Sequence, residues 1–165
     1  MNLLLVRHAE AEDETVSGSD FERQLTRYGH ETAAAVARGL RHCIQGSVLV
    51  WSSPLLRTRE TAAYISQAFD VEVERYHESI PAGDLNTLSR DWQSLTSQPE
   101  TLIVVGHQPH LGIWTTRLTR VSVPVKKASV MGIRLKAVDE LEGELQWYAL
   151  PEMMRAVAAD PKVQY

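Results

Sequence analysis

Four side chains suited to a phosphoryl group follow three apolar runs of the sequence. Arg7 and His8 come directly after the first run, Arg57 comes shortly after the second, and His107 lies just beyond the third. A guanidinium group can fork onto two phosphate oxygens, which a lysine ammonium group cannot do. An imidazole ring can donate to a phosphoryl oxygen or attack phosphorus. These residue types predict a pocket for a dianionic phosphoryl group.

Within this set, His8 is the candidate nucleophile. To attack phosphorus it must be neutral with a lone pair on one nitrogen, and the other nitrogen should donate to a carbonyl group that fixes the tautomer. Arg7, Arg57 and His107 are the predicted phosphate ligands, and they would stabilise the charge that grows in the transition state. Ser53 is a further candidate donor to phosphate, next to its expected role in starting a helix.

The three apolar runs must bring these side chains together. Leu3–Val6, Val48–Trp51 and Leu102–Val105 are short, continuous and rich in Leu and Val, which is typical of strands buried on both faces. If the strands are parallel neighbours, the residues after them meet at the carboxyl edge of the sheet. Open α/β sheets bind their ligands at that edge.

The remaining segments continue the alternation of strands and helices. Sequence patterns predict helices over 26–42, 53–69, 85–95 and 109–119, an edge strand over 71–76, a hairpin over 133–137 and 144–150, and loops over 9–24 and 77–86. Thr26 is the expected N-cap of the first helix, and Ser53-Pro54 is the expected start of the second. The order predicts a three-layer α/β sandwich with a mainly parallel sheet flanked by helices. We expect one domain over 1–165, with 151–165 as a C-terminal tail, and loop 9–24 as a flexible rim over the site.

Composition narrows the classes of protein. The 165 residues carry a formal net charge of −4, with 44% hydrophobic and 23% charged residues, which is typical of a globular protein and argues against a general nucleic-acid binder. Cys43 is the single cysteine, so no intramolecular disulfide is expected. No apolar run approaches the roughly 18–20 residues of a membrane span, and the N-terminus does not resemble a secretory signal. We therefore expect a cytoplasmic protein without membrane or nucleic-acid partners; the sequence does not indicate its oligomeric state.

Other phosphatase chemistries fit the sequence poorly. A cysteine-dependent phosphatase needs an arginine six positions after its cysteine, where this chain has Leu49. The chain lacks a GxxxxGK[ST] phosphate loop, and His107 and His110 do not show the spacing of metal ligands on a helix. A histidine nucleophile that works without a metal or cofactor remains.

Several motifs, taken in chain order, resemble one known family. They are Arg7-His8, Leu25-Thr26-x-x-Gly29, Ser53-Pro54-x-x-Arg57-x-x-x-Thr61-Ala62 and Gly106-His107-x-Pro109. Together they resemble the histidine phosphatase superfamily, also called phosphoglycerate-mutase-like. The small size is similar to its SixA-type phosphohistidine phosphatases, which lack the helical cap domain of the mutases and sugar phosphatases.

The resemblance implies a phosphoglycerate-mutase-like fold without a cap domain and a phosphatase activity. It implies His8 as the residue that becomes phosphorylated and Arg7, Arg57 and His107 as its phosphate pocket. Capped members use a glutamate after the third strand to protonate the leaving group. Glu78 is the match by position and Asp84 the alternative. The chain departs from the common Arg-His-Gly motif, because Ala9 follows the histidine.

The chemistry of the leaving group favours one substrate class. An alkoxide needs a proton donor, whereas the imidazole that leaves phosphohistidine has a conjugate acid with a pKa of about 6.5 and needs less assistance. An uncapped pocket also suits a phosphorylated side chain of another protein. We therefore expect hydrolysis of phosphohistidine on proteins. The alternatives are a broad phosphomonoesterase acting on small molecules through the same nucleophile, and a non-catalytic module that binds phosphorylated partners.

Overall fold

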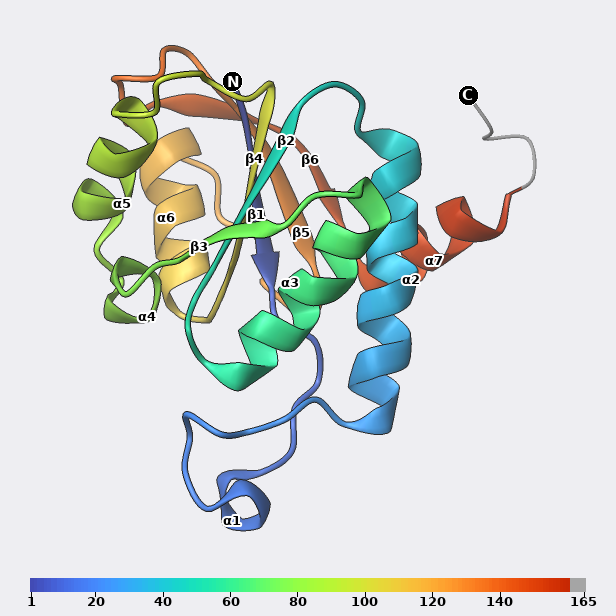
Figure 1. Cartoon of the computed structure of the whole chain (residues 1–165). Helices are drawn as coiled ribbons and strands as arrows, with labels where there is room; N and C mark the ends of the chain where they lie inside the picture. Colours follow the sequence, from blue (N-terminus) through green and yellow to red (C-terminus); the bar gives the residue numbers. More distant parts are fainter. Residues whose placement is uncertain (161–165) are drawn as a thin grey trace.

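The computed structural model in Figure 1 describes residues 1–160, which contain one six-stranded sheet in the order β3-β2-β4-β1-β5-β6. The strands are β1 (Asn2–Arg7), β2 (Val48–Ser52), β3 (Val73–Tyr76), β4 (Thr101–Gly106), β5 (Val130–Leu135) and β6 (Gly143–Ala149). The first four run parallel to one another, β5 pairs antiparallel with β1, and β6 pairs antiparallel with β5. This confirms the mainly parallel sheet, with β4 between β1 and β2.

Helices cover both faces of the sheet. They are α1 (Glu14–Ser17), α2 (Arg27–Cys43), α3 (Leu56–Phe69), α4 (Ser79–Ala82), α5 (Leu85–Gln93), α6 (His110–Thr119) and α7 (Pro151–Ala159). Figure 1 shows α2, α3 and α7 on one face and α5 and α6 on the other, which confirms the predicted three-layer sandwich. Within residues 1–160, no helix is both long and apolar enough to cross a membrane.

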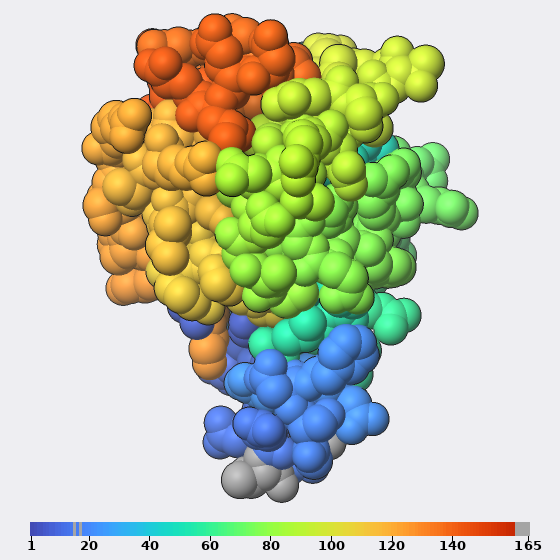
Figure 2. All heavy atoms as spheres, turned by 90° about the vertical axis from the view of Figure 1, so that its left-hand side faces the viewer, coloured from blue at the N-terminus to red at the C-terminus, as the bar shows by residue number. Residues whose placement is uncertain are grey.

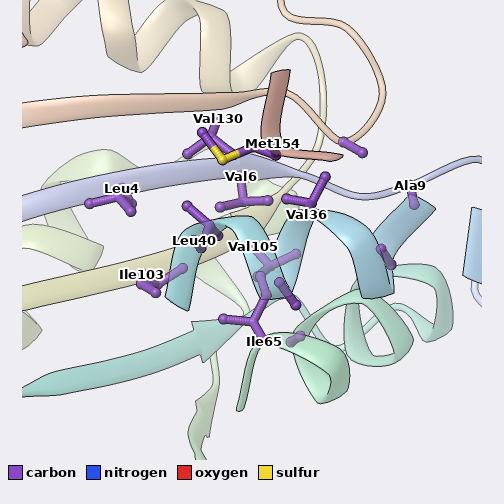
Figure 3. Packing of buried hydrophobic residues seen from close by; sticks show 14 of the residues in the cluster. Leu4, Val6, Ala9, Val36, Leu40, Ile65, Ile103, Val105, Val130 and Met154 are labelled. Carbon is purple, nitrogen blue, oxygen red and sulfur yellow. The ribbon is translucent and has the colours of Figure 1, made fainter. Parts of the chain in front are cut away.

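Strand β1 contributes to two hydrophobic cores because its side chains alternate between the faces. Leu4 and Val6 belong to the core beneath α2, α3 and α7, which Figure 3 shows from close by. Leu3 and Leu5 belong to the core beneath α5 and α6. All four side chains are buried, and full burial of one such side chain contributes roughly 1.5–3 kcal/mol. The strand that leads to His8 is therefore held from both sides.

The start of α2 explains the Leu-Thr-x-x-Gly motif. Thr26 is the N-cap, as predicted, and its hydroxyl accepts from the Gly29 amide at 3.0 Å. The Thr26 amide donates to the carbonyl of Glu10 at 3.0 Å. A Cβ atom at Gly29 would collide with that carbonyl oxygen, so only glycine allows the close approach. The motif thus fixes the chain two residues after His8.

Helix α3 begins later than predicted. The expected N-cap at Ser53 is wrong, because Leu55 is the N-cap and the first helical residue is Leu56. The Ser53 amide donates to the carbonyl of Val105 at 3.0 Å, which continues the pairing of β2 with β4 and keeps Ser53-Pro54 outside the helix. The Ser53 hydroxyl accepts from the Leu55 amide at 3.3 Å, so it supports the turn before the helix.

Two further segments are more ordered than predicted. The predicted loop over 77–86 contains α4, which ends at Gly83 with a φ of +72°. The predicted tail contains α7, which packs on α2 where Gly39 lets the backbone of Met154 approach closely. Met154 is buried in the core of that face, which Figure 3 shows. Tertiary packing therefore makes a helix of this part of the tail, and residues 161–165 lie outside the described chain.

Segment 9–24 is also held by hydrogen bonds. It projects beyond the carboxyl edge of the sheet and carries α1 (Figure 1). Its two arms meet where the Glu12 amide donates to the Gln24 carbonyl at 2.8 Å. At its end, the Leu25 amide donates to the Glu60 carboxylate on α3 at 2.7 Å. The segment is bonded to α3 beside the predicted site.

Candidate active site

The predicted nucleophile and phosphate ligands, His8, Arg7, Arg57 and His107, meet where β1, β2 and β4 end. Backbone hydrogen bonds continue past the strands, because the His8 amide donates to the Gly106 carbonyl and the Ala128 amide donates to the His8 carbonyl, both at 3.1 Å. His8 is therefore fixed on both sides by backbone. Figure 2 shows the surface hollowed between segment 9–24 and the rest of the molecule, where the dark blue, teal and orange parts of the chain come together.

The tautomer of His8 follows from its hydrogen bond. Nδ1 lies 2.7 Å from the carbonyl oxygen of Ala9, and a carbonyl can only accept, so Nδ1 carries the proton. In the neutral ring, Nε2 then carries the lone pair. This is the arrangement that the sequence analysis requires of a nucleophile.

Thr61 on α3 holds Ala9, the residue whose carbonyl fixes this tautomer. The Ala9 amide donates to the Thr61 hydroxyl at 3.2 Å, and that hydroxyl donates to the backbone carbonyl of Arg57 at 2.8 Å. Thr61 is 2% exposed. Its hydroxyl therefore links Ala9, which holds the His8 ring, to Arg57, which is a predicted phosphate ligand.

His8 is neutral at physiological pH. Its pKa is lowered to about 3, mainly by burial; the hydrogen bond to Ala9 opposes the lowering, and the neighbouring His107 ring and the charges of Arg57 and Arg7 add to it. A protonated ring would have no lone pair with which to attack phosphorus. Burial thus keeps the candidate nucleophile unprotonated, and the cations that would bind a phosphate contribute to the same effect.

His107 lies against His8 and Ser53. The two imidazole centroids are 5.4 Å apart and their planes are inclined by 57°. Nε2 of His107 lies 2.7 Å from the hydroxyl of Ser53, which is fully buried. Burial lowers the pKa of His107 to about 4, Arg57 adds to this effect and Asp20 opposes it. Ser53 therefore lies in the site, where it contacts His107.

Each of the two arginines uses only some of its N–H donors for hydrogen bonds within the protein. Nη1 of Arg7 donates to the carbonyl of Val125 at 2.9 Å, and Nη1 of Arg57 donates to the carbonyl of Asp20 at 2.6 Å. Burial lowers the pKa of both guanidinium groups, which nevertheless remain charged at neutral pH.

Three nitrogen atoms of the site are buried without a hydrogen-bond partner. They are Nε of Arg7, Nε of Arg57 and Nδ1 of His107, and within the described residues the buried unpartnered side-chain polar atoms are these three. Buried donors are normally paired, so each such group in a native fold needs an explanation. All three belong to the predicted phosphate ligands. The arrangement can bind an oxyanion beside Nε2 of His8.

Glu78 and Asp84 lie outside this cluster. Glu78 is exposed at the N-cap of α4 and lines an open hollow of about 470 Å³ with Asp84. Within the described chain, no hydrogen bond or ion pair joins Glu78 to the four clustered residues. Asp84 caps α5 through Thr87, whose hydroxyl and amide lower its pKa, and a lowered pKa opposes a role as proton donor.

Sequence reasoning missed Asp20 and the part played by Thr61. Thr61 stands in a quoted motif, so its pattern was visible but its hydrogen bonds to Ala9 and Arg57 were not. Asp20 lies in a segment without periodicity, and the sequence carries no signal that its carboxylate reaches Arg57. Within residues 1–160, no group of three or more His, Cys, Asp or Glu side chains is arranged to hold a metal ion.

Comparison with known proteins gives consistent matches. A family model described as "Histidine phosphatase superfamily (branch 1)" matches residues 3–79. The SixA homologue of Haemophilus influenzae, a phosphohistidine phosphatase, is 30% identical over 122 residues, which cover 68% of this chain and 73% of that protein. An uncharacterised protein of Picosynechococcus sp. is 30% identical over 140 residues, 81% of this chain and 85% of its own length.

The fold matches solved structures as well. The structure of the protein histidine phosphatase SixA complexed with tungstate superposes with a TM-score of 0.81 at 22% identity, covering 93% of this chain and 99% of that one. At this level of identity the likeness concerns the fold. The carboxyl edge described above is the part of that fold where the sequence motifs converge.

Proposed function

The chain belongs to the histidine phosphatase superfamily and is a phosphatase, and we propose that it hydrolyses phosphohistidine on proteins through a covalent intermediate on His8. The observation that carries the proposal is the hydrogen bond from Nδ1 of His8 to the Ala9 carbonyl at 2.7 Å. It leaves the lone pair of a neutral ring on Nε2, beside the guanidinium groups of Arg7 and Arg57.

In the first proposed step, Nε2 of His8 attacks phosphorus. The bond between phosphorus and the substrate imidazole breaks, and its electron pair stays on the imidazole nitrogen, which takes a proton from solvent. Arg7, Arg57 and His107 donate to the phosphoryl oxygens, since three of their buried nitrogens have no other partner. The product of this step is phosphorylated His8 and the dephosphorylated protein.

In the second step, water attacks the phosphoryl group on His8. The bond from phosphorus to Nε2 breaks, inorganic phosphate forms, and the water proton leaves to solvent. The ring returns to its neutral form, which suits its pKa of about 3. Neither step requires a metal ion or a cofactor.

The position of Glu78 supports phosphohistidine over alkyl phosphates. An imidazole leaving group needs little help from an acid, whereas an alkoxide depends on one. Glu78 is exposed and bonds to none of the four clustered residues in the described chain, and Asp84 is engaged as a helix cap. A site in which no acid is positioned to protonate the leaving group suits imidazole better than an alkoxide.

Trapping the phosphoenzyme tests the proposal. The protein is mixed with a ³²P-phosphohistidine protein, quenched in alkali and digested. We expect a label that is stable in alkali, labile in acid and located at His8. His8→Ala should give no label and no turnover, whereas His42→Asn, on the last turn of α2, should behave like the wild type. Turnover that survives in His8→Ala, or a label on another residue, contradicts the proposal.

A further inference from the structure

Asp20 bonds to a predicted phosphate ligand from outside the cluster. Its Oδ2 accepts from Nη2 of Arg57 at 3.1 Å, and its backbone carbonyl accepts from Nη1 at 2.6 Å. The Arg57 side chain is 7% exposed, whereas that of Asp20 is 51% exposed. A half-exposed carboxylate thus accepts a hydrogen bond from a buried guanidinium group. The expected ligand of that guanidinium group is a phosphoryl group.

The carboxylate is anionic, and its charge acts on the rest of the pocket. Burial raises the pKa of Asp20, but hydrogen bonds from Arg23 and Arg57 lower it below its usual value overall. The same charge opposes the lowering of the pKa of His107. With both histidines neutral, the formal charge of Arg7, Arg57 and Asp20 together is +1, where the two guanidinium groups alone would give +2.

The segment that presents Asp20 has anchors besides this carboxylate, whose Oδ1 also accepts from Nη1 of Arg23 at 3.0 Å. The Phe21 carbonyl accepts from the Leu56 amide at 3.1 Å, and Arg23 donates through Nε to the Glu12 carbonyl at 2.6 Å. The Asp20 backbone carbonyl also remains on Arg57 when the side chain changes. Replacing the carboxylate by an amide therefore removes a charge and leaves these anchors.

From these contacts we infer that Asp20 is a specificity-determining residue, a resident anion that competes with phosphate for Arg57. Free inorganic phosphate must displace the carboxylate with only its contacts inside the pocket to compensate. A phosphoryl group carried by a protein also gains contacts between the two protein surfaces, so it displaces Asp20 more readily. Asp20 thereby weakens retention of the product and favours phosphate attached to a macromolecule. This inference rests on the proposed function for the identity of the substrate, though not for the competition itself.

Binding of inorganic phosphate measures the competition without turnover. Calorimetry is performed on wild type, Asp20→Asn and Glu22→Gln at low and high salt. Glu22 is a matched control, because the change removes the same charge from the same segment and its carboxylate contacts Ser19 instead of Arg57. We expect phosphate to bind about fivefold more tightly to Asp20→Asn at low salt, with a smaller difference at high salt, and Glu22→Gln to stay within about twofold of wild type.

The opposite outcomes are distinct. Unchanged or weaker phosphate binding in Asp20→Asn means that the carboxylate merely orients Arg57, and it overturns the inference. Asp20→Ala removes the same charge and must shift binding in the same direction. Tighter binding in both variants, together with no hydrolysis of a phosphohistidine protein by the wild type, supports the competition and refutes the proposed function. Normal hydrolysis of a phosphohistidine protein by the wild type, together with unchanged phosphate binding in the variants, supports the proposed function and refutes the competition.

Discussion

Two regions at the same edge of the sheet differ in how their polar groups are satisfied. The predicted phosphate pocket follows the central strands β1, β2 and β4, and three of its buried nitrogens have no hydrogen-bond partner. Segment 77–84 follows the edge strand β3, and its polar side chains, except that of the exposed Glu78, have partners within the fold. Its His77 accepts from the Ser79 hydroxyl through Nδ1 at 2.7 Å and lies 2.6 Å from Asp91 through Nε2.

The difference indicates which region is built for an external anion. Buried donors without partners gain most from an incoming ligand, because their desolvation has already occurred. The groups of segment 77–84 have partners within the fold, and Glu78 between them faces solvent. We therefore expect substitutions in the pocket to affect turnover far more than substitutions in segment 77–84.

Among substitutions around His8, the largest expected effect is that of losing a pocket arginine. Arg57→Gln should lower kcat/KM by roughly 10²–10³, the usual cost of removing one group that stabilises transition-state charge. Arg59→Gln is the control, since Arg59 is exposed and lies over the Tyr76 ring at 5.1 Å. Steady-state kinetics on a phosphohistidine protein measure both. An equal loss of kcat/KM in the two variants would mean that a positive charge anywhere on α3 matters, and it would contradict a specific role for Arg57 in the pocket.

The second effect concerns pH and stability. Unfolded histidine has a pKa near 6.5, whereas burial lowers the pKa of His8 to about 3 in the fold, so below about pH 6.5 the unfolded chain binds the extra proton. Stability should fall as pH drops from 6.5 toward 3, with His8 accounting for about 2 kcal/mol at pH 5.

Urea unfolding at pH 7.5 and pH 5 measures this loss. In His8→Gln the loss should be smaller by about that 2 kcal/mol, because glutamine does not titrate. An identical pH dependence in wild type and His8→Gln would show that His8 titrates normally in the fold.

The third effect is that of Thr61, which supports the pocket without belonging to it. Thr61→Val removes the acceptor of the Ala9 amide and should lower kcat about tenfold, with ¹⁵N NMR detecting a second tautomer of His8. Thr115→Val is a matched control, since Thr115 is fully buried in α6 and its hydroxyl bonds to the Leu111 carbonyl in the same manner. A single unchanged tautomer in Thr61→Val would assign Thr61 a purely structural role.

The smallest expected effect is that of Glu78. Glu78→Gln should change turnover of phosphohistidine by less than about twofold, because imidazole leaves without an acid. Alkyl phosphates measured in parallel sharpen the comparison. High activity on them that disappears in Glu78→Gln would favour the phosphomonoesterase alternative and place a catalytic group in segment 77–84.

The same contrast explains what could be predicted from the sequence. Continuous apolar runs identify central strands, and the residues that follow them must lie at one edge, so the meeting of Arg7, His8, Arg57 and His107 was predictable. Their catalytic roles remain predictions. Thr26 was predictable as a cap because its hydrogen bond is local.

Contacts that depend on tertiary structure were not predictable. Helix α3 starts late because the Ser53 amide pairs with β4, which lies far away in the sequence. Helix α7 depends on packing against Gly39 of α2. Asp20 reaches Arg57 across 37 positions from a segment without periodicity. In each case the deciding partner is distant in sequence and leaves no local pattern.

The strand order also bears on how the molecule is made. β4 lies between β1 and β2, although it is the third of the three to be synthesised. A nascent chain that has not reached Thr101–Gly106 carries two apolar strands whose shared neighbour does not yet exist. His8 is therefore synthesised well before the strand that completes its pocket.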